Sequence, residues 1–262
     1  MDIQEQLREL GVRSGDLLML HASMRRIGPV PGGARGLIGQ IEEVVTPSGT
    51  LLMVLGAENG WDEINQRPEA ERAALLALAP PFDPLRTPAY HEVGVLAEQF
   101  RQMQGTLVSN NPEGRFAARG GRAEEILSNA PWDDYYGPGS PLEKLCKWGG
   151  RILRMGADTN TITALHYAEY LCSLPGKRRV CRHGNVGSPG NPVIKTVSCL
   201  DDEHGIFEWK GEDYFADLTE EYLSLGRART GRVGHANSEL IEAADIVEFG
   251  RQWMDEHLGV AS

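Results

Sequence analysis

The feature that most constrains this chain is a short, wholly apolar run followed by an amphipathic helix and a second apolar run. Residues 17–20 read Leu-Leu-Met-Leu, which predicts a buried strand that ends at His21. Apolar side chains at helical spacing predict a helix over 37–45, and a Thr-Pro-Ser-Gly turn leads from it into a strand over 50–55. Because two strands joined through a helix can run in the same direction, we expect the sheet to be at least partly parallel.

The rest of the chain extends this pattern. A further strand is predicted over 151–156, and a helix over 162–173 follows it after a run of good helix-capping residues. The insertion around 56–90 and a β-ribbon around 180–207 are interpreted as elements that cover a substrate. We therefore expect one α/β domain over residues 1–262, with a central mixed, partly parallel sheet flanked by helices and a smaller β-rich and helical covering part. Other helices are predicted over 2–10, 69–78, 93–103, 120–129, 140–148, 212–225 and 238–257.

Composition narrows the range of partners. The net charge of −11 argues against nucleic acid or an anionic membrane surface as the main partner and is compatible with a cationic ligand. No apolar run approaches about 18 residues, and the N-terminus lacks a hydrophobic signal core, so a cytoplasmic location is expected. No two of the four cysteines form a C-x-x-C pair, which favours reduced structural thiols and no metal.

The first candidate for chemistry is a histidine with a carboxylate one helical turn away. His166 and Glu169 are three residues apart on a predicted helix and therefore share a face. That helix follows a predicted strand, and ligands gather at the carboxyl ends of strands in open α/β sheets. A histidine placed there could take a proton from an attacking amine, while the carboxylate holds its tautomer. The alternative is a half-buried helix histidine with a surface ion partner.

The second candidate lies where the first predicted strand ends. His21 and Ser23 precede a turn rich in glycine and proline over 28–33. Backbone N–H groups in such a loop can bind a diphosphate, and His21 could help in proton transfer or position a donor. The alternative is a turn that merely needs its glycines. The glycine spacing matches neither the dinucleotide nor the P-loop pattern, so NAD and ATP are not expected.

The third candidate is a set of acidic and aromatic clusters. They read Trp-Asp-Glu at 61–63, Trp-Asp-Asp-Tyr-Tyr at 132–136 and Asp-Asp-Glu-His at 201–204. Carboxylates and aromatic faces hold ammonium groups, so these clusters favour a polycationic ligand. The alternative for each cluster is solvated loop charge.

Longer segments match one known family. Residues 15–23, Gly-Asp-Leu-Leu-Met-Leu-His-Ala-Ser, and the turn that follows look like an N-terminal signature. Pro-Pro-Phe-Asp-Pro at 80–84 is similar to an internal motif, and the most specific match is Thr-Ala-Leu-His-Tyr-Ala-Glu at 163–169. Similar segments continue in the same order to about residue 258. Over nearly its whole length the chain therefore resembles the aminoglycoside 3-N-acetyltransferases.

The resemblance implies an activity and a site. The activity is acetyl-CoA-dependent N-acetylation of the 3-amino group of 2-deoxystreptamine aminoglycosides, which confers antibiotic resistance, by direct transfer and without a metal. His166 is implied as the general base, with Glu169 in the same site and His21 near the reaction centre. The residues implied to bind acetyl-CoA are Ser23, Met24, Arg25, Val30, Gly32, Gly33 and Asn111. Those expected to bind the polycation are Asp62, Asp83, Asp201, Asp202 and Glu203.

One segment departs from the family pattern. Family members often carry Ser-x-His-Pro in mid-chain, whereas this chain has Asn111 where the histidine would stand. The departure bears on the substrate more than on the reaction. Two other hypotheses stay open: acetylation of another small amine with incidental antibiotic activity, and a CoA- or polycation-binding protein without turnover. The chain is expected to be a monomer or a homodimer.

Overall fold

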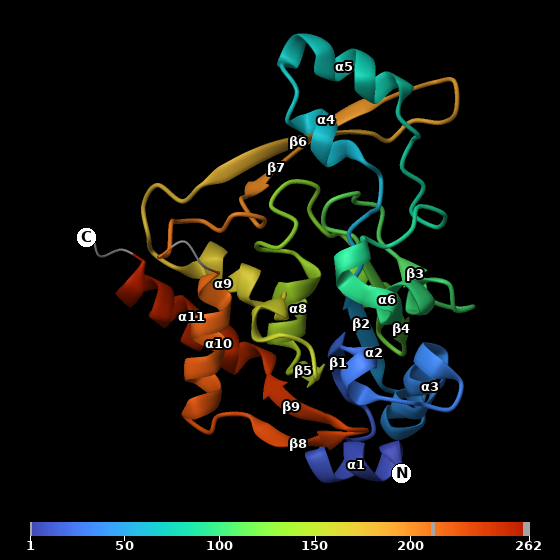
Figure 1. Cartoon of the computed structure of the whole chain (residues 1–262), viewed down its shortest axis with the longest axis vertical. Helices are drawn as coiled ribbons and strands as arrows, with labels where there is room; N and C mark the ends of the chain where they lie inside the picture. Colours follow the sequence, from blue (N-terminus) through green and yellow to red (C-terminus); the bar gives the residue numbers. More distant parts are fainter. Residues whose placement is uncertain (1, 211–212, 259–262) are drawn as a thin grey trace.

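The computed structural model describes residues 2–210 and 213–258, and a seven-stranded mixed sheet runs through its centre (Figure 1). The order of the strands is β3-β4-β2-β1-β5-β9-β8. They are β1 (Leu17–Ala22), β2 (Thr50–Val54), β3 (Leu107–Val108), β4 (Phe116–Gly120), β5 (Arg151–Met155), β8 (Arg229–Val233) and β9 (Ala236–Glu242). The expected mixed α/β fold is confirmed.

The middle of the sheet is parallel. Strand β1 pairs in parallel with β2 on one side and with β5 on the other, so that Leu18 stands opposite both Leu51 and Arg151. The remaining pairs, β2–β4, β3–β4, β5–β9 and β8–β9, are antiparallel. The predicted strand–helix–strand unit is therefore present, and the carboxyl ends of β1, β2 and β5 lie together at one edge.

Both faces of the sheet are buried, which explains the continuous apolar run of β1. Leu17 and Met19 pack into one core, and Leu18 and Leu20 into the other, because alternate side chains leave a strand on opposite faces. Helices α1, α3 and α6 cover one face, and α8, α9, α10 and α11 cover the other (Figure 1).

The larger helices of the chain are α1 (Ile3–Leu10), α3 (Gly33–Val45), α5 (Glu69–Leu78), α6 (Gly94–Arg101), α10 (Tyr214–Ser224) and α11 (Ala243–His257). Shorter helices are α2 (Met24–Ile27), α4 (Trp61–Asn65), α7 (Ala123–Leu127), α8 (Pro141–Lys147), α9 (Leu165–Leu171) and the 3₁₀ turns η1 (His91–Val93) and η2 (Thr159–Thr161).

A second, smaller structure lies beyond the strand ends, at the top of Figure 1. Strands β6 (Arg179–Asn185) and β7 (Ile194–Leu200) form the predicted ribbon, and α4 packs against it. Trp61 of α4 is fully buried, and a Cβ at Gly184 would lie 2.1 Å from its ring, so glycine is required there for the close approach. The Asn65 amide also bonds to the backbone N–H and C=O of His183, at 2.8 and 3.0 Å. The insertion after β2 and the ribbon thus form one packed unit.

Several predicted boundaries are wrong. The predicted helix over 238–257 begins only at Ala243, because the preceding residues form β9 and pair with β5 and β8. The predicted helix over 120–129 shrinks to α7, since β4 extends to Gly120. The helix of His166 begins at Leu165, after the turn η2, and is α9. Long-range strand pairing, which local periodicity does not contain, overrides the helical pattern in the first two.

Other predictions of local structure are confirmed. The helix predicted over 2–10 is α1; Asp2 caps it by accepting the N–H of Glu5 at 3.1 Å, and Gly11 ends it at a φ of 105°. The helix predicted over 212–225 is α10, although residue 212 lies outside the described residues. Within the described ranges, the chain contains no helix with the length and apolar character needed to cross a bilayer.

Candidate active site

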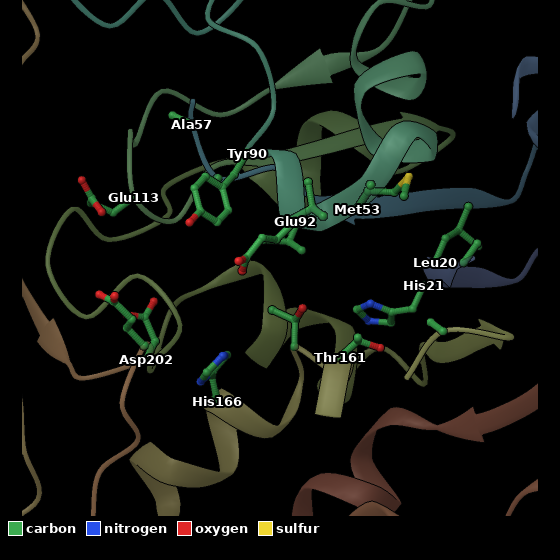
Figure 2. A pocket seen from close by; sticks show the side chains of 18 of the residues that line it. Leu20, His21, Met53, Ala57, Tyr90, Glu92, Glu113, Thr161, His166 and Asp202 are labelled. Atoms are coloured by element: carbon green, nitrogen blue, oxygen red, sulfur yellow. The ribbon is translucent and has the colours of Figure 1, made fainter. Parts of the chain in front are cut away.

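A cavity of about 790 Å³ opens at the carboxyl ends of the three parallel strands. His21 and Ala22 of β1, Val54 of β2 and Ala157 after β5 line its floor, as the topology of an open parallel sheet favours. The opposite wall comes from the packed unit of the insertion after β2 and the β6–β7 ribbon, here called the covering unit, and it includes Asp62 of α4. Figure 2 shows His21 at one end of this cavity, Glu113 and Asp202 at the other, and His166 nearer the acidic end.

His166 is held from three sides. Its Nδ1 lies 2.8 Å from Oε2 of Glu169, the residue one turn along α9, whose side chain is 1% exposed. The ring stacks on Tyr136, with centroids 5.0 Å apart and 10° between the planes, and also contacts Phe215. Tyr214 donates its hydroxyl hydrogen to the other oxygen of Glu169 and accepts the N–H of Ile206 at 3.1 Å. These contacts fix the ring and its tautomer, so that Nε2 is the nitrogen left for chemistry.

The charge of His166 is set by opposing effects. Burial disfavours the protonated ring, but the carboxylate and the hydrogen bond of Glu169 outweigh burial and raise the pKa of His166 above its ordinary value. The imidazole is therefore a stronger base than a free histidine, and its protonated form has a partner in place.

His21 is in the opposite situation at the other end of the cavity. Burial, and then the Arg154 guanidinium, lower the pKa of His21 to about 4. Arg154 itself pairs with Glu239 at 2.8 Å. The buried Nε2 of His21 has no hydrogen-bond partner among the described residues. His21 is thus a neutral imidazole at neutral pH that lines the cavity, and its unpartnered Nε2 is buried.

The residues expected to bind acetyl-CoA fall into two groups. Ser23, Met24 and Arg25, on and just before α2, line the cavity beyond His21. Val30 and Gly32 lie in the turn that leads into α3 and Gly33 is the first residue of that helix; none of the three is among the lining residues. Asn111 is buried and also lies outside the lining, because its side chain bonds to backbone groups around it.

The residues expected to bind a polycation are also divided. Asp62, Asp202 and Glu203 line the cavity, and burial together with the charge of Glu203 raises the pKa of Asp62. Asp201 accepts the N–H groups of Glu203 and His204 and lines a second cavity of about 650 Å³ on the Glu169 side of His166. The structure does not bring Asp83 to either cavity, because its carboxylate accepts two N–H groups of its own turn.

Sequence reasoning missed an arginine at the acidic end. Arg182 of β6 lies 2.7 Å from Asp202, 3.7 Å from Glu203 and 3.8 Å from Glu113, with only 12% of its side chain exposed. Its Nη1 also donates to the Tyr135 hydroxyl at 3.1 Å, and that hydroxyl donates to Asp202 at 2.7 Å. A single basic residue in a strand has no sequence pattern that marks it as part of a site, and the same is true of Glu113. The aromatic loop over 132–136 was noticed, but only the fold shows that its tyrosines reach the site.

The part of the chain that the structure describes contains no candidate metal site. No three histidine, cysteine, aspartate or glutamate side chains gather there in a way that could hold an ion. Glu169 is engaged by His166 and Tyr214 instead.

The sequence matches one family model over most of its length. Residues 19–255 match the model described as aminoglycoside 3-N-acetyltransferase. Aminoglycoside N(3)-acetyltransferase VII of Streptomyces paromomycinus is 36% identical over 267 residues, which cover 98% of this chain and 91% of that protein.

Solved structures agree with the sequence comparison. AAC-IIIb in a binary complex with CoASH superposes with a TM-score of 0.91 at 35% identity, covering 99% of this chain and 97% of that one. AAC-VIa bound to sisomicin superposes with a TM-score of 0.91 at 35% identity, covering 98% and 97%.

Proposed function

The chain belongs to the aminoglycoside 3-N-acetyltransferase family, and on that premise we propose that it transfers the acetyl group of acetyl-CoA to the 3-amino group of a 2-deoxystreptamine aminoglycoside. Such a reaction neutralises an ammonium position of the antibiotic, so the physiological result is aminoglycoside resistance. Two similar structures hold the two kinds of ligand separately, CoASH in one and sisomicin in the other, which supports a site of this type.

The observation that carries the proposal is the place of His166 in the cavity. It lies between the end at His21, which contains Ser23 and Arg25, and an acidic end that contains Asp62 and Asp202. A thioester needs uncharged surroundings, whereas a polycation needs several carboxylates. One cavity with two different ends can therefore bind both. The residue with a raised pKa stands where the two ligands would meet.

The proposed chemistry is direct transfer with His166 as general base. The neutral 3-amino nitrogen attacks the thioester carbonyl carbon while Nε2 of His166 takes a proton from that nitrogen. The tetrahedral intermediate collapses, the C–S bond breaks, and the proton on His166 passes to the leaving thiolate. The products are the acetamide and CoA thiol. Glu169 holds Nδ1–H and stabilises the imidazolium, and Tyr214 keeps that carboxylate in place.

The donor is assigned to the end of the cavity at β1 and α2. His21, Ser23, Met24 and Arg25 would contact the acetylated arm, and the neutral ring of His21 suits an uncharged amide or thioester. Val30, Gly32 and Gly33 lie beyond the lining and would meet the nucleotide part of CoA. Asn111 can contribute to binding only through the turn that it holds.

The aminoglycoside is assigned to the acidic end. Asp62, Asp202 and Glu203 would pair with its ammonium groups, and Asp201 would support the loop that carries two of them. Asp83 would act only through the turn that it caps. The insertion around 56–90 and the ribbon around 180–207 would cover the acceptor within a single domain. We further propose a cytoplasmic location and a monomer or homodimer.

A thiol-release assay tests this function. Purified protein is mixed with acetyl-CoA and, in turn, sisomicin, gentamicin and simple polyamines, and the acetylated nitrogen is identified by NMR. We expect CoA release with the aminoglycosides and an acetyl group on the 3-amino nitrogen. Release only with simple amines points to acetylation of another substrate, and calorimetric binding without release points to a non-catalytic binding protein; either result contradicts the proposal.

A further inference from the structure

The segment that departs from the family pattern forms a built turn beside the cavity. The Asn111 side-chain oxygen accepts the N–H groups of both Glu113 and Gly114 at 3.0 Å, and its amide donates to the carbonyl of Trp132 at 2.8 Å. All three bonds are to backbone atoms, and the residue is 5% exposed. Asn111 therefore fixes the backbone from which the Glu113 side chain projects.

A tyrosine packs on the same turn. A Cβ at Gly114 would lie 2.3 Å from the Tyr135 ring, so only glycine allows the turn to approach this closely. The Tyr135 hydroxyl in turn bonds to Asp202 and accepts from Arg182. The turn over 111–114, the tyrosine and the acidic loop are thus joined in one rigid arrangement.

Within this arrangement Glu113 is the largely buried carboxylate that remains available, whereas Glu203 is 58% exposed. Asp202 is engaged at both oxygens, one by Arg182 at 2.7 Å and the other by Tyr135 at 2.7 Å. Glu113 lines the cavity with 15% of its side chain exposed, and its carboxylate accepts no hydrogen bond from the described residues. The nearest cation is the Nε of Arg182, at 3.8 Å. Figure 2 shows the Glu113 side chain across the cavity end from Asp202.

Resting on the proposed function, we propose that Glu113 is a specificity-determining residue that binds a second ammonium group of the aminoglycoside, away from the reacting amine, and that Asn111 is its positioning residue. Arg182 donates to Asp202 at 2.7 Å but lies 3.8 Å from Glu113 and makes no hydrogen bond to it, so the Glu113 carboxylate can take a further cation as a hydrogen-bonding partner. Acetyl-CoA carries no ammonium group, and the selection therefore acts on the acceptor alone.

The surroundings of Glu113 link this binding to protons. Burial, opposed by Arg182 and reinforced by Asp202, Asp62 and Glu203, raises the pKa of Glu113 to about 7. The free protein therefore carries a proton on Glu113 in a large fraction of molecules at neutral pH. An ammonium at this carboxylate favours the ionised form, so binding expels that proton, and affinity rises as pH increases through 7.

Calorimetry on the Glu113→Gln variant tests the proposal. Sisomicin is titrated into the full chain at pH 7 in phosphate and in Tris, whose ionisation enthalpies differ, so that the exchanged protons are counted. Because sisomicin itself titrates, the informative quantity is the difference between wild type and variant. We expect wild type to release about half a proton more, and the variant to raise the aminoglycoside KM about tenfold at pH 8 with kcat and the acetyl-CoA KM unchanged. Glu63→Gln, an exposed neighbour on α4 outside the cavity lining, is the matched control.

The role of Asn111 needs its own variants. Asn111→Ala removes the acceptor of two N–H groups and should reproduce the KM increase and the lost proton release, with kcat retained. Asn111→Asp keeps an acceptor oxygen and should restore much of the binding; thermal melting confirms that both variants fold. An unchanged proton count and KM in Glu113→Gln, or equal increases in both KM values, would overturn the proposal. Since calorimetry needs no turnover, absence of acetylation in wild type would refute the proposed function without deciding this inference.

Discussion

Two histidines line one cavity, and their surroundings drive the charge of the two rings in opposite directions. At the end of β1, burial and the Arg154 guanidinium lower the pKa of His21 to about 4. On α9, Glu169 outweighs the effect of burial and raises the pKa of His166. The same side chain is thus an uncharged polar group at one end and a proton acceptor with a waiting counter-ion at the other. The partner of each ring, rather than the residue type, distinguishes the candidate base.

The two ends of the cavity also differ in how they are built. The end at His21 is the edge of the central sheet, where parallel strands fix the backbone through regular pairing. The end at Asp202 combines loops, α4 and the ribbon, and ion pairs around Arg182 hold it together. A thioester arm needs a shaped, neutral channel, and a polycation needs several carboxylates. Under the proposed function, the sheet would supply the donor site, and the insertion after β2 together with the β6–β7 ribbon would supply acceptor selectivity.

The largest effect on turnover should follow removal of the His166 ring, which lies between the two ends of the cavity. We expect His166→Ala to lower turnover about 10²–10⁴-fold, the usual loss when a general base is deleted. Both KM values should change little, because neither ligand depends on this ring for its charge contacts. His257→Ala, on α11 outside the cavity lining, is the control. Turnover within about threefold of wild type would remove His166 from the chemistry.

The pH dependence sharpens the contrast between the two rings. A general base must be unprotonated, so kcat at saturating substrates should fall about tenfold per pH unit below the pKa of His166, which lies above the ordinary value. Glu169→Gln removes the negative charge, and the acidic limb should therefore move to lower pH. His21→Asn should leave the shape unchanged, since His21 does not titrate near neutrality. The measurement is the pH–rate profile of wild type, Glu169→Gln and His21→Asn with one aminoglycoside. An acidic limb that shifts in His21→Asn and not in Glu169→Gln would make His21 the general base instead.

The acidic end should affect the acceptor alone. Asp62→Asn should raise the aminoglycoside KM about tenfold, because one charge-assisted contact contributes about 1.5 kcal/mol. The acetyl-CoA KM should stay constant. Steady-state kinetics in both substrates give the answer, with Glu63→Gln as the control on the same helix. Equal increases in the two KM values would mean that the cavity is not divided as described.

The smallest effect is expected at the donor end. Arg25 is exposed at the cavity rim, so Arg25→Ala should raise the acetyl-CoA KM only about threefold, and less at high salt. The aminoglycoside KM should not change. Kinetics at two salt concentrations, with the exposed Arg13→Ala as control, measure this effect. A change confined to the aminoglycoside KM would place the acceptor at this end.

The fold could be predicted where local signals and burial agree. The apolar run of β1 and the amphipathic α3 identified the parallel centre of the sheet. A strand buried on both faces is apolar throughout, and a helix buried on one face is apolar at every third or fourth residue. Strands β4 and β9 were missed as strands because their partners β2 and β5 lie far away in the sequence, and β8 was missed although it pairs with the adjacent β9. Neither β8, whose residues are mostly exposed, nor the start of β9 carries a periodic pattern that identifies a strand.

The candidate site was predictable only in part. The spacing of His166 and Glu169 pointed to a shared helix face, and the pair is in contact. Arg182, Glu113 and Tyr214 could not be found, because each becomes meaningful through neighbours from other parts of the chain. Asn111 drew notice as a departure from a motif, but its use as the support of a turn is visible only in three dimensions.

A crystal structure of the ternary complex with CoA and sisomicin tests the division of the cavity most directly. We expect the CoA sulfur to lie between His21 and the His166 ring, the ammonium groups to lie among Asp62, Glu113, Asp202 and Glu203, and Nε2 of His166 to stand within hydrogen-bond distance of the 3-amino nitrogen. A sulfur atom bound on the acidic side, or a 3-amino group remote from the His166 ring, would contradict it.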